Sequence, residues 1–163
     1  MSLRNLFLFL VLLPFLCFEI SAQTNRSDSS CKKRVLQKWE NLSQDGKYEE
    51  AIAELRKQMD FEDNKSKHKD YWHLGQLYAF NNDYDSAISY LKKSANMFDL
   101  LFDKFWRYYY KGTIAFLQRD KTKLNKYNSK MQKKKSAYYE GSANTLKSLF
   151  ENFEKEYFEA YNK

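Results

Sequence analysis

The chain has 163 residues, of which 18% are aromatic and 30% charged, and its formal net charge is +7 at pH 7. This length suits a single domain, and one proline and four glycines are too few for a loop-rich fold. The composition therefore favours an all-α domain.

The first 22 residues have the pattern of a secretion signal. Arg4 is followed by an apolar run over residues 6–18, and Ser21-Ala22 offers a small-residue cleavage site. The run is shorter than the roughly 20 apolar residues that a membrane-spanning helix needs. We therefore expect residues 1–22 to be removed near Ala22, and the protein to reach the periplasm, cell envelope or medium. A lipoprotein anchored through Cys17 is the alternative, but the two large residues before that cysteine argue against it.

Residues 23–30 are polar and serine-rich, and we expect a disordered leader there. The helical domain is predicted over residues 31–163. Cys31 is the one cysteine left after cleavage, so no disulfide framework is expected. It is interpreted as an unpaired cysteine at the frayed start of the first helix, with an intermolecular bridge or a reactive thiol as the alternative.

A first helix pair is predicted over about residues 32–65. Asp45-Gly46 has turn chemistry, and four apolar residues follow it at helical spacing. These residues are Tyr48, Ala51, Ile52 and Leu55, and the same types recur 36 positions later at Tyr84, Ala87, Ile88 and Leu91.

The second pair, over about residues 68–101, has the clearest pattern. Tyr71, Leu74 and Tyr78 form one helical face. Gly75 lacks a side chain where a second helix comes close, and Ala87 is its small counterpart on that helix. The segment Asn81-Asn82-Asp83 between them has turn chemistry. This stretch resembles the tetratricopeptide (TPR) repeat.

A third, degenerate pair is predicted over about residues 105–136. Tyr108, Gly112 and Ile114 lie 37 positions after Tyr71, Gly75 and Leu77, but no alanine marks the crossing with the second helix. From Ser142, a plausible N-cap, to Tyr161, apolar residues trace an amphipathic face that predicts one capping helix over about 142–161. The fold class expected is a short right-handed α-α superhelix of two to three TPR-like helix pairs plus a C-terminal helix.

The resemblance implies a groove that binds a peptide or a partner helix. Its lining positions would be Trp72, Gln76, Ala79, Phe80, Trp106, Tyr109, Thr113, Phe116 and Leu117. Family members that clamp a terminal carboxylate use lysine and asparagine at such positions. Trp72 and Gln76 stand at two of them here, so an apolar or aromatic-containing peptide is the better expectation. The alternative is that Trp106 and Phe116 are core residues.

A basic segment supplies a second interpretation. Residues 121–135 contain seven lysines and no acidic residue, whereas the remainder of the chain after residue 22 has no net charge. The lysines are Lys121, Lys123, Lys126, Lys130, Lys133, Lys134 and Lys135. They could bind an anionic membrane or cell-surface polymer, while nucleic acid is the less favoured partner of an exported protein. The alternative is a solvated helix face matched in part by Glu151, Glu154, Glu156 and Glu159.

No catalytic pattern is found in the sequence. It has neither a glycine-rich phosphate loop nor a Gly-x-Ser-x-Gly elbow. His68 and His73 lie five residues apart and so do not share a helix face. We therefore predict a non-catalytic protein-interaction module without a metal or a cofactor.

Overall fold

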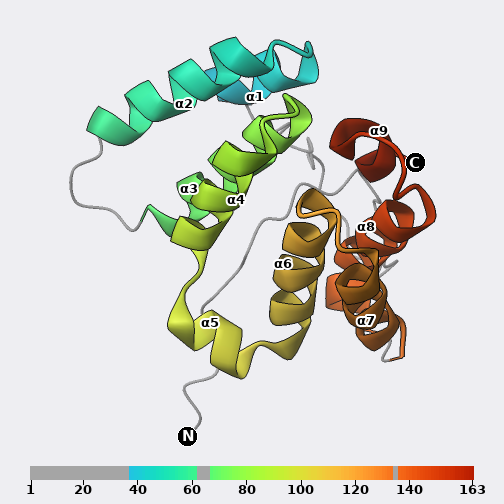
Figure 1. Ribbon diagram of the computed structural model, residues 1–163. Helices are drawn as coiled ribbons and strands as arrows, with labels where there is room; N and C mark the ends of the chain where they lie inside the picture. The colour runs from blue at the N-terminus through green and yellow to red at the C-terminus, as the bar shows by residue number, and fades with distance from the viewer. Residues whose placement is uncertain (1–36, 62–66, 134–135) are drawn as a thin grey trace, which may run out of the picture. The chain divides into compact units, whose positions relative to one another are not determined.

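The computed structural model describes residues 37–61, 67–133 and 136–163, all of them within the unit Val35–Lys163. The predicted signal peptide, the leader, Cys31, Lys134 and Lys135 lie outside these ranges. Over the described ranges the chain forms helices and no strand, so the predicted all-α class is confirmed (Figure 1). The helices are α1 Lys38–Gln44, α2 Tyr48–Phe61, α3 His68–Phe80, α4 Tyr84–Ser94, α5 Met97–Phe102, α6 Lys104–Leu117, α7 Lys121–Gln132, the 3-10 turn η1 Ala137–Tyr139, α8 Glu140–Glu151 and α9 Tyr157–Tyr161.

The helices pack in adjacent pairs along the chain. α1 packs against α2, α3 against α4 and α6 against α7, and α2 also contacts α3. α8 packs on both α6 and α7, in the place where a further repeat would begin. This arrangement buries two apolar clusters, one around Leu55 and Leu74 and a larger one around Phe116 and Leu146.

The three turns inside these pairs have the same geometry. Gly46, Asn82 and Arg119 each have a positive φ, of 74°, 60° and 56° respectively. In each turn this residue's N–H bonds the carbonyl three residues back, and the next N–H bonds the carbonyl five residues back. These are the bonds that end a helix with a left-handed residue. The turns therefore recur at offsets of 36 and 37 residues, the spacing that the sequence pattern showed.

Gly75 and Gly112 allow two different pairs of helices to pack closely. A β-carbon on Gly75 would lie 2.6 Å from Leu91 Cγ on α4, so the close approach within the second pair is present. The facing side chain is Leu91, while the predicted counterpart Ala87 is fully buried one turn earlier. A β-carbon on Gly112 would instead lie 2.5 Å from Leu146 Cδ1 on α8. Gly112 therefore permits the packing of α8 on α6 rather than a crossing with α7.

The C-terminal region departs from the prediction of one capping helix over 142–161. The chain leaves the helix at Asn152 (φ −110°, ψ 32°) and starts again as α9 at Tyr157. Ser142 is not the N-cap, because α8 begins at Glu140 and Ser142 is buried in its first turn. The break redirects the chain so that α9 turns back toward α3 (Figure 1).

α5 was not predicted as a separate helix. Asn96 caps its start by accepting a hydrogen bond from the Phe98 N–H, at 3.0 Å. Asp103 ends it and caps α6, accepting bonds from the N–H groups of Phe105 and Trp106. In the described part of the chain no helix is long and apolar enough to cross a membrane.

Candidate functional site

The predicted groove residues lie on two neighbouring helices. α3 carries Trp72, Gln76 and Phe80 at intervals of four residues, which places them on one side of the helix. α6 carries Trp106, Tyr109, Thr113 and Phe116. We call these seven residues the α3–α6 face. The two helices meet through aromatic rings, with the centroid of Trp72 4.6 Å from that of Trp106 and 5.6 Å from that of Tyr109.

The chain's own α9 covers one end of this face. The ring of Tyr157 lies 5.5 Å from that of Phe80 and 5.7 Å from that of Phe116, measured between centroids. Tyr161, one helical turn on, lies 5.3 Å from Phe80 in an edge-to-face arrangement. Such aromatic pairs add attraction beyond the apolar area they bury.

Polar contacts fix α9 at the turn between α3 and α4. The N–H of Tyr157 donates to the Tyr84 hydroxyl at 3.0 Å, and the Asn82 side-chain amide donates to Glu156 at 2.8 Å. At the other end of α9, the Ser148 hydroxyl donates to the Ala160 carbonyl at 2.8 Å. α9 is therefore held from both α8 and the α3–α4 turn.

Coverage by α8 and α9 puts several predicted partner-binding residues in the core. Thr113 and Phe116 are fully buried, and Tyr109 and Gln76 are nearly so. The prediction that these four contact a partner does not fit this arrangement, because the chain's own C-terminal helices fill the space beside them. Trp106 and Phe116 were given the alternative of being core residues. Phe116 is a core residue, whereas Trp106 is half-buried.

The opposite end of the face is less covered. Trp72 and Trp106 are both half-buried, and the ring contacts of α9 in the described chain involve neither of them. Phe80 is also half-buried, but its ring contacts Tyr157, Phe158 and Tyr161. Trp72 and Trp106 are thus the residues of the α3–α6 face that an outside molecule can reach with least rearrangement.

Burial changes the pKa of the tyrosines at the end of the face that α9 covers. It raises the pKa of the Tyr157 hydroxyl, with Tyr161 adding to the rise, and it raises the pKa of Tyr109 in the same way. Thr113 Oγ1 and the Tyr157 hydroxyl have no hydrogen-bond partner among the described residues. The Gln76 side chain faces the Tyr157 hydroxyl without reaching hydrogen-bond geometry. These tyrosines stay neutral in the folded protein, which suits a structural contact rather than proton transfer.

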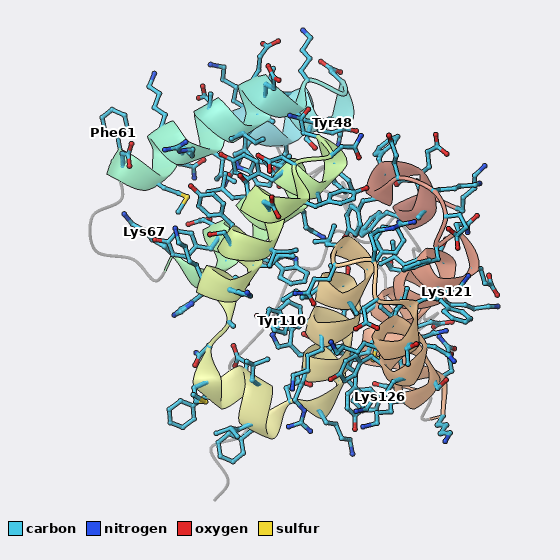
Figure 2. The ribbon with its side chains drawn as sticks, viewed as in Figure 1. Tyr48, Phe61, Lys67, Tyr110, Lys121 and Lys126 are labelled. Carbon is cyan, nitrogen blue, oxygen red and sulfur yellow. The ribbon has the colours of Figure 1, made fainter. Side chains whose placement is uncertain are left out.

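The lysine segment lies mainly on α7, where Figure 2 shows Lys121 and Lys126. Lys121 pairs with Glu154 at 3.2 Å and Lys123 with Asp120 at 2.8 Å. Lys126 and Lys130 instead lie over the rings of Tyr127 and Tyr108. Within the described ranges no carboxylate lies in ion-pair distance of Lys126, Lys130 or Lys133. The structure therefore neutralises the first turn of α7 and leaves the later lysines exposed.

The comparison with protein families identifies the central helix pair. The family described as Tetratricopeptide repeat matches residues 71–97, which run from α3 through the turn and α4 to the first residue of α5. These residues are a tetratricopeptide repeat. The comparisons with curated proteins and with solved structures returned no match. The TPR repeat confirms the family predicted from Tyr71, Gly75 and Ala87, and it marks the protein as carrying a protein-interaction module.

Sequence reasoning missed the residues of α9 that cover one end of the α3–α6 face. Tyr157 and Tyr161 were predicted to belong to one long amphipathic helix, and nothing in their local pattern says which surface they cover. The available signal was the run from Asn152 to Glu156, which has weak helix formers at its start. A break there would have freed the last aromatic residues to pack elsewhere.

Among the described ranges, no group of three or more histidine, cysteine, aspartate or glutamate side chains is arranged to hold a metal ion. His68 and His73 have separate surroundings. The ring of His73 lies 5.0 Å from that of Trp39, and His68 Nδ1 lies 3.3 Å from the Lys93 carbonyl.

Proposed function

We propose that the protein is an exported, non-catalytic module that binds a peptide or partner helix through the Trp72–Trp106 end of the α3–α6 face. The observation that carries the proposal is the Trp72–Trp106 contact itself. The two tryptophan rings are 4.6 Å apart and both half-buried, and Trp72 belongs to α3, the first helix of the TPR repeat. Tryptophan is enriched among the few residues that dominate binding energy at protein interfaces.

The chain's own α9, which covers the other end of the α3–α6 face, indicates which side chains a ligand of this face would carry. α9 presents two tyrosines one helical turn apart to Phe80. A partner helix with aromatic side chains at that spacing would make equivalent contacts with Trp72 and Trp106. A longer ligand that reached Phe80 would have to displace α9, so its apparent affinity would depend on how firmly α9 is held.

A selection from a random-peptide display library tests the proposal with the whole chain as bait. We expect enriched peptides to carry aromatic residues three or four apart, and to lose binding to a Trp72→Ala variant. The matched control is Phe61→Ser, because Phe61 is an exposed aromatic residue at the end of α2, away from the α3–α6 face (Figure 2). No enrichment, or equal binding to Trp72→Ala, would reject the assignment of this face.

A second candidate is supported by the exposed lysines of α7. Lys126, Lys130 and Lys133 lack carboxylate partners in the described chain and could bind an anionic membrane or cell-surface polymer. Binding of this kind weakens steeply as salt rises, because the charges are exposed. Contacts of an aromatic peptide with tryptophan would change little over the same range of salt.

Export is a separate part of the proposal, supported by the pattern of residues 1–22. N-terminal sequencing of protein recovered outside the cytoplasm is expected to begin near Gln23. Protein that keeps Met1, or that carries lipid on Cys17, would overturn this part without affecting the binding face.

A further inference from the structure

α5 exposes four large apolar side chains within six residues. Met97, Phe98, Leu101 and Phe102 are 69%, 70%, 60% and 79% exposed. Their spacing puts all four on one side of the helix, and the rings of Phe98 and Phe102 stack with centroids 5.9 Å apart. We call these four side chains the α5 apolar face. Grouped exposed apolar residues mark interaction sites, whereas scattered ones do not.

The helix that carries this face is anchored to the rest of the domain. Leu100, on its other side, packs against the larger core cluster, and its carbonyl accepts a hydrogen bond from the Arg107 guanidinium at 2.9 Å. Asn96 and Asp103 cap its two ends. The apolar face is thus presented outward by a fixed helix.

Cations flank α5 along the chain on both sides. Lys92 and Lys93 form the last turn of α4 before it, and Lys104 begins α6 after it, all three of them exposed. The carboxylates nearby are Asp99 and Asp103, and Asp103 already bonds two backbone N–H groups and the Tyr139 hydroxyl. Residues 92–107 therefore carry four cations against two anions.

The positive surface continues from α5 to α7. Arg107 donates a hydrogen bond to α5, and its guanidinium lies over the ring of Tyr108. Lys130 of α7 lies over the same ring. Tyr108 also stacks on Tyr127, over which Lys126 lies. These contacts connect α5, through Arg107, to the part of α7 whose lysines lack carboxylate partners in the described chain.

We propose that α5 is a membrane-docking element, which inserts its apolar face into the interface of an anionic lipid bilayer while the flanking lysines contact the headgroups. An apolar patch bordered by cations matches the two layers of such a surface, acyl chains below anionic headgroups. Pairing of two copies through this face is disfavoured, because it would bring the same lysines together. A helix of six residues is far too short to span a bilayer, so the contact is interfacial.

Vesicle sedimentation with the whole chain tests the proposal. The probe is a vesicle of phosphatidylcholine with about 30% phosphatidylglycerol, compared with pure phosphatidylcholine, at low salt. We expect Phe102→Ser to lower the partition coefficient on anionic vesicles at least about fivefold, since an inserted phenylalanine leaves the bilayer interface. Phe61→Ser is the matched control, because Phe61 is 80% exposed against 79% for Phe102. Any binding by residues 1–22 is common to both variants.

Circular dichroism first verifies that both variants are folded, as expected for changes at exposed side chains. Amide hydrogen exchange is then the second readout, and lipid should slow exchange in residues 97–102 but not in α2. Equal partitioning of Phe102→Ser and Phe61→Ser, with no slowing in 97–102, would overturn the proposal. A concentration-dependent dimer that Phe102→Ser abolishes, with vesicle binding unchanged, would overturn it in favour of a second copy.

Discussion

Gly75 on α3 and Leu91 on α4 are in contact at the centre of the TPR repeat, with no room for a side chain between them. A β-carbon at residue 75 would meet Leu91 Cγ at 2.6 Å, Cδ2 at 2.7 Å and the Leu91 backbone nitrogen at 3.1 Å. Leu91 is fully buried, so its side chain has little space to move. The repeat therefore depends on glycine here for a steric reason.

We predict that Gly75→Ala destabilises the protein by about 1–3 kcal/mol through overpacking, despite the better helix propensity of alanine. In a Leu91→Ala background the same change should cost much less, because the colliding side chain is gone. Denaturant unfolding of the two single variants and the double variant measures this coupling. Additive effects would show that α3 and α4 do not approach this closely.

Thr113 was predicted to line a groove, and the structure buries it completely, with no hydrogen-bond partner for its hydroxyl among the described residues. Thr113→Val should therefore leave stability unchanged or raise it by about 1 kcal/mol, since it removes a buried group that has no partner. Thr113→Ser keeps the hydroxyl and loses a methyl group, so it should destabilise by about 1 kcal/mol. Thermal unfolding compares the two, and a destabilised Thr113→Val would mean that the hydroxyl has a partner.

Alkaline pH should unfold the protein through its buried tyrosines. Burial raises the pKa of Tyr109 and Tyr157 in the folded state, whereas the unfolded chain ionises them near the usual value of 10.0. Their contribution to stability is thus intact below pH 10. It falls as the pH rises above that value, by about 1.4 kcal/mol per pH unit for each tyrosine.

Denaturant unfolding at a series of pH values tests this slope. The double variant Tyr109→Phe/Tyr157→Phe should lose less stability between neutral and alkaline pH than the unchanged chain, because phenylalanine does not ionise. The comparison removes the contribution of the lysines, which are the same in both proteins. Identical slopes would mean that α9 leaves the two hydroxyls open to solvent.

Tyr84 connects the TPR repeat to α9, because its hydroxyl accepts the hydrogen bond from the Tyr157 N–H at 3.0 Å. Tyr84→Phe removes this acceptor and should loosen α9 by about 1 kcal/mol. We expect amide exchange in residues 157–161 to quicken about fivefold, with little change in α6. A peptide that displaces α9 should also bind this variant more tightly, and unchanged exchange would show that the bond does not hold α9.

Local patterns were sufficient to predict the helix pairs. The spacing of Tyr71, Leu74 and Tyr78 and the turn residue Asn82 depend on neighbours within one helical hairpin, so the sequence carries them directly. The left-handed turn at Arg119 has no glycine or asparagine to signal it. The sequence predicted a third helix pair over about residues 105–136 but not the position of this turn.

The covered face could not be predicted, because it depends on contacts between residues about 75 apart. Tyr157 has the same apolar periodicity whether it continues α8 or turns back to Phe80. Only the packing of α9 against α3 decides between these outcomes. The family pattern placed Thr113 and Phe116 on an open surface, because it describes a repeat and not the segment that follows it.

The affinity of one library-selected peptide, measured by calorimetry for the unchanged chain and for Trp72→Ala, decides whether Trp72 and Trp106 form the binding site. We predict that Trp72→Ala loses about 2 kcal/mol of binding free energy, which is roughly 30-fold in Kd, and remains folded by circular dichroism. Tyr71→Ala, on the neighbouring residue that packs toward Tyr90, should lower stability and leave Kd nearly unchanged. Unchanged affinity in Trp72→Ala, together with loss of binding in Lys126→Gln/Lys130→Gln, would exclude the α3–α6 face as the binding site and assign binding to α7.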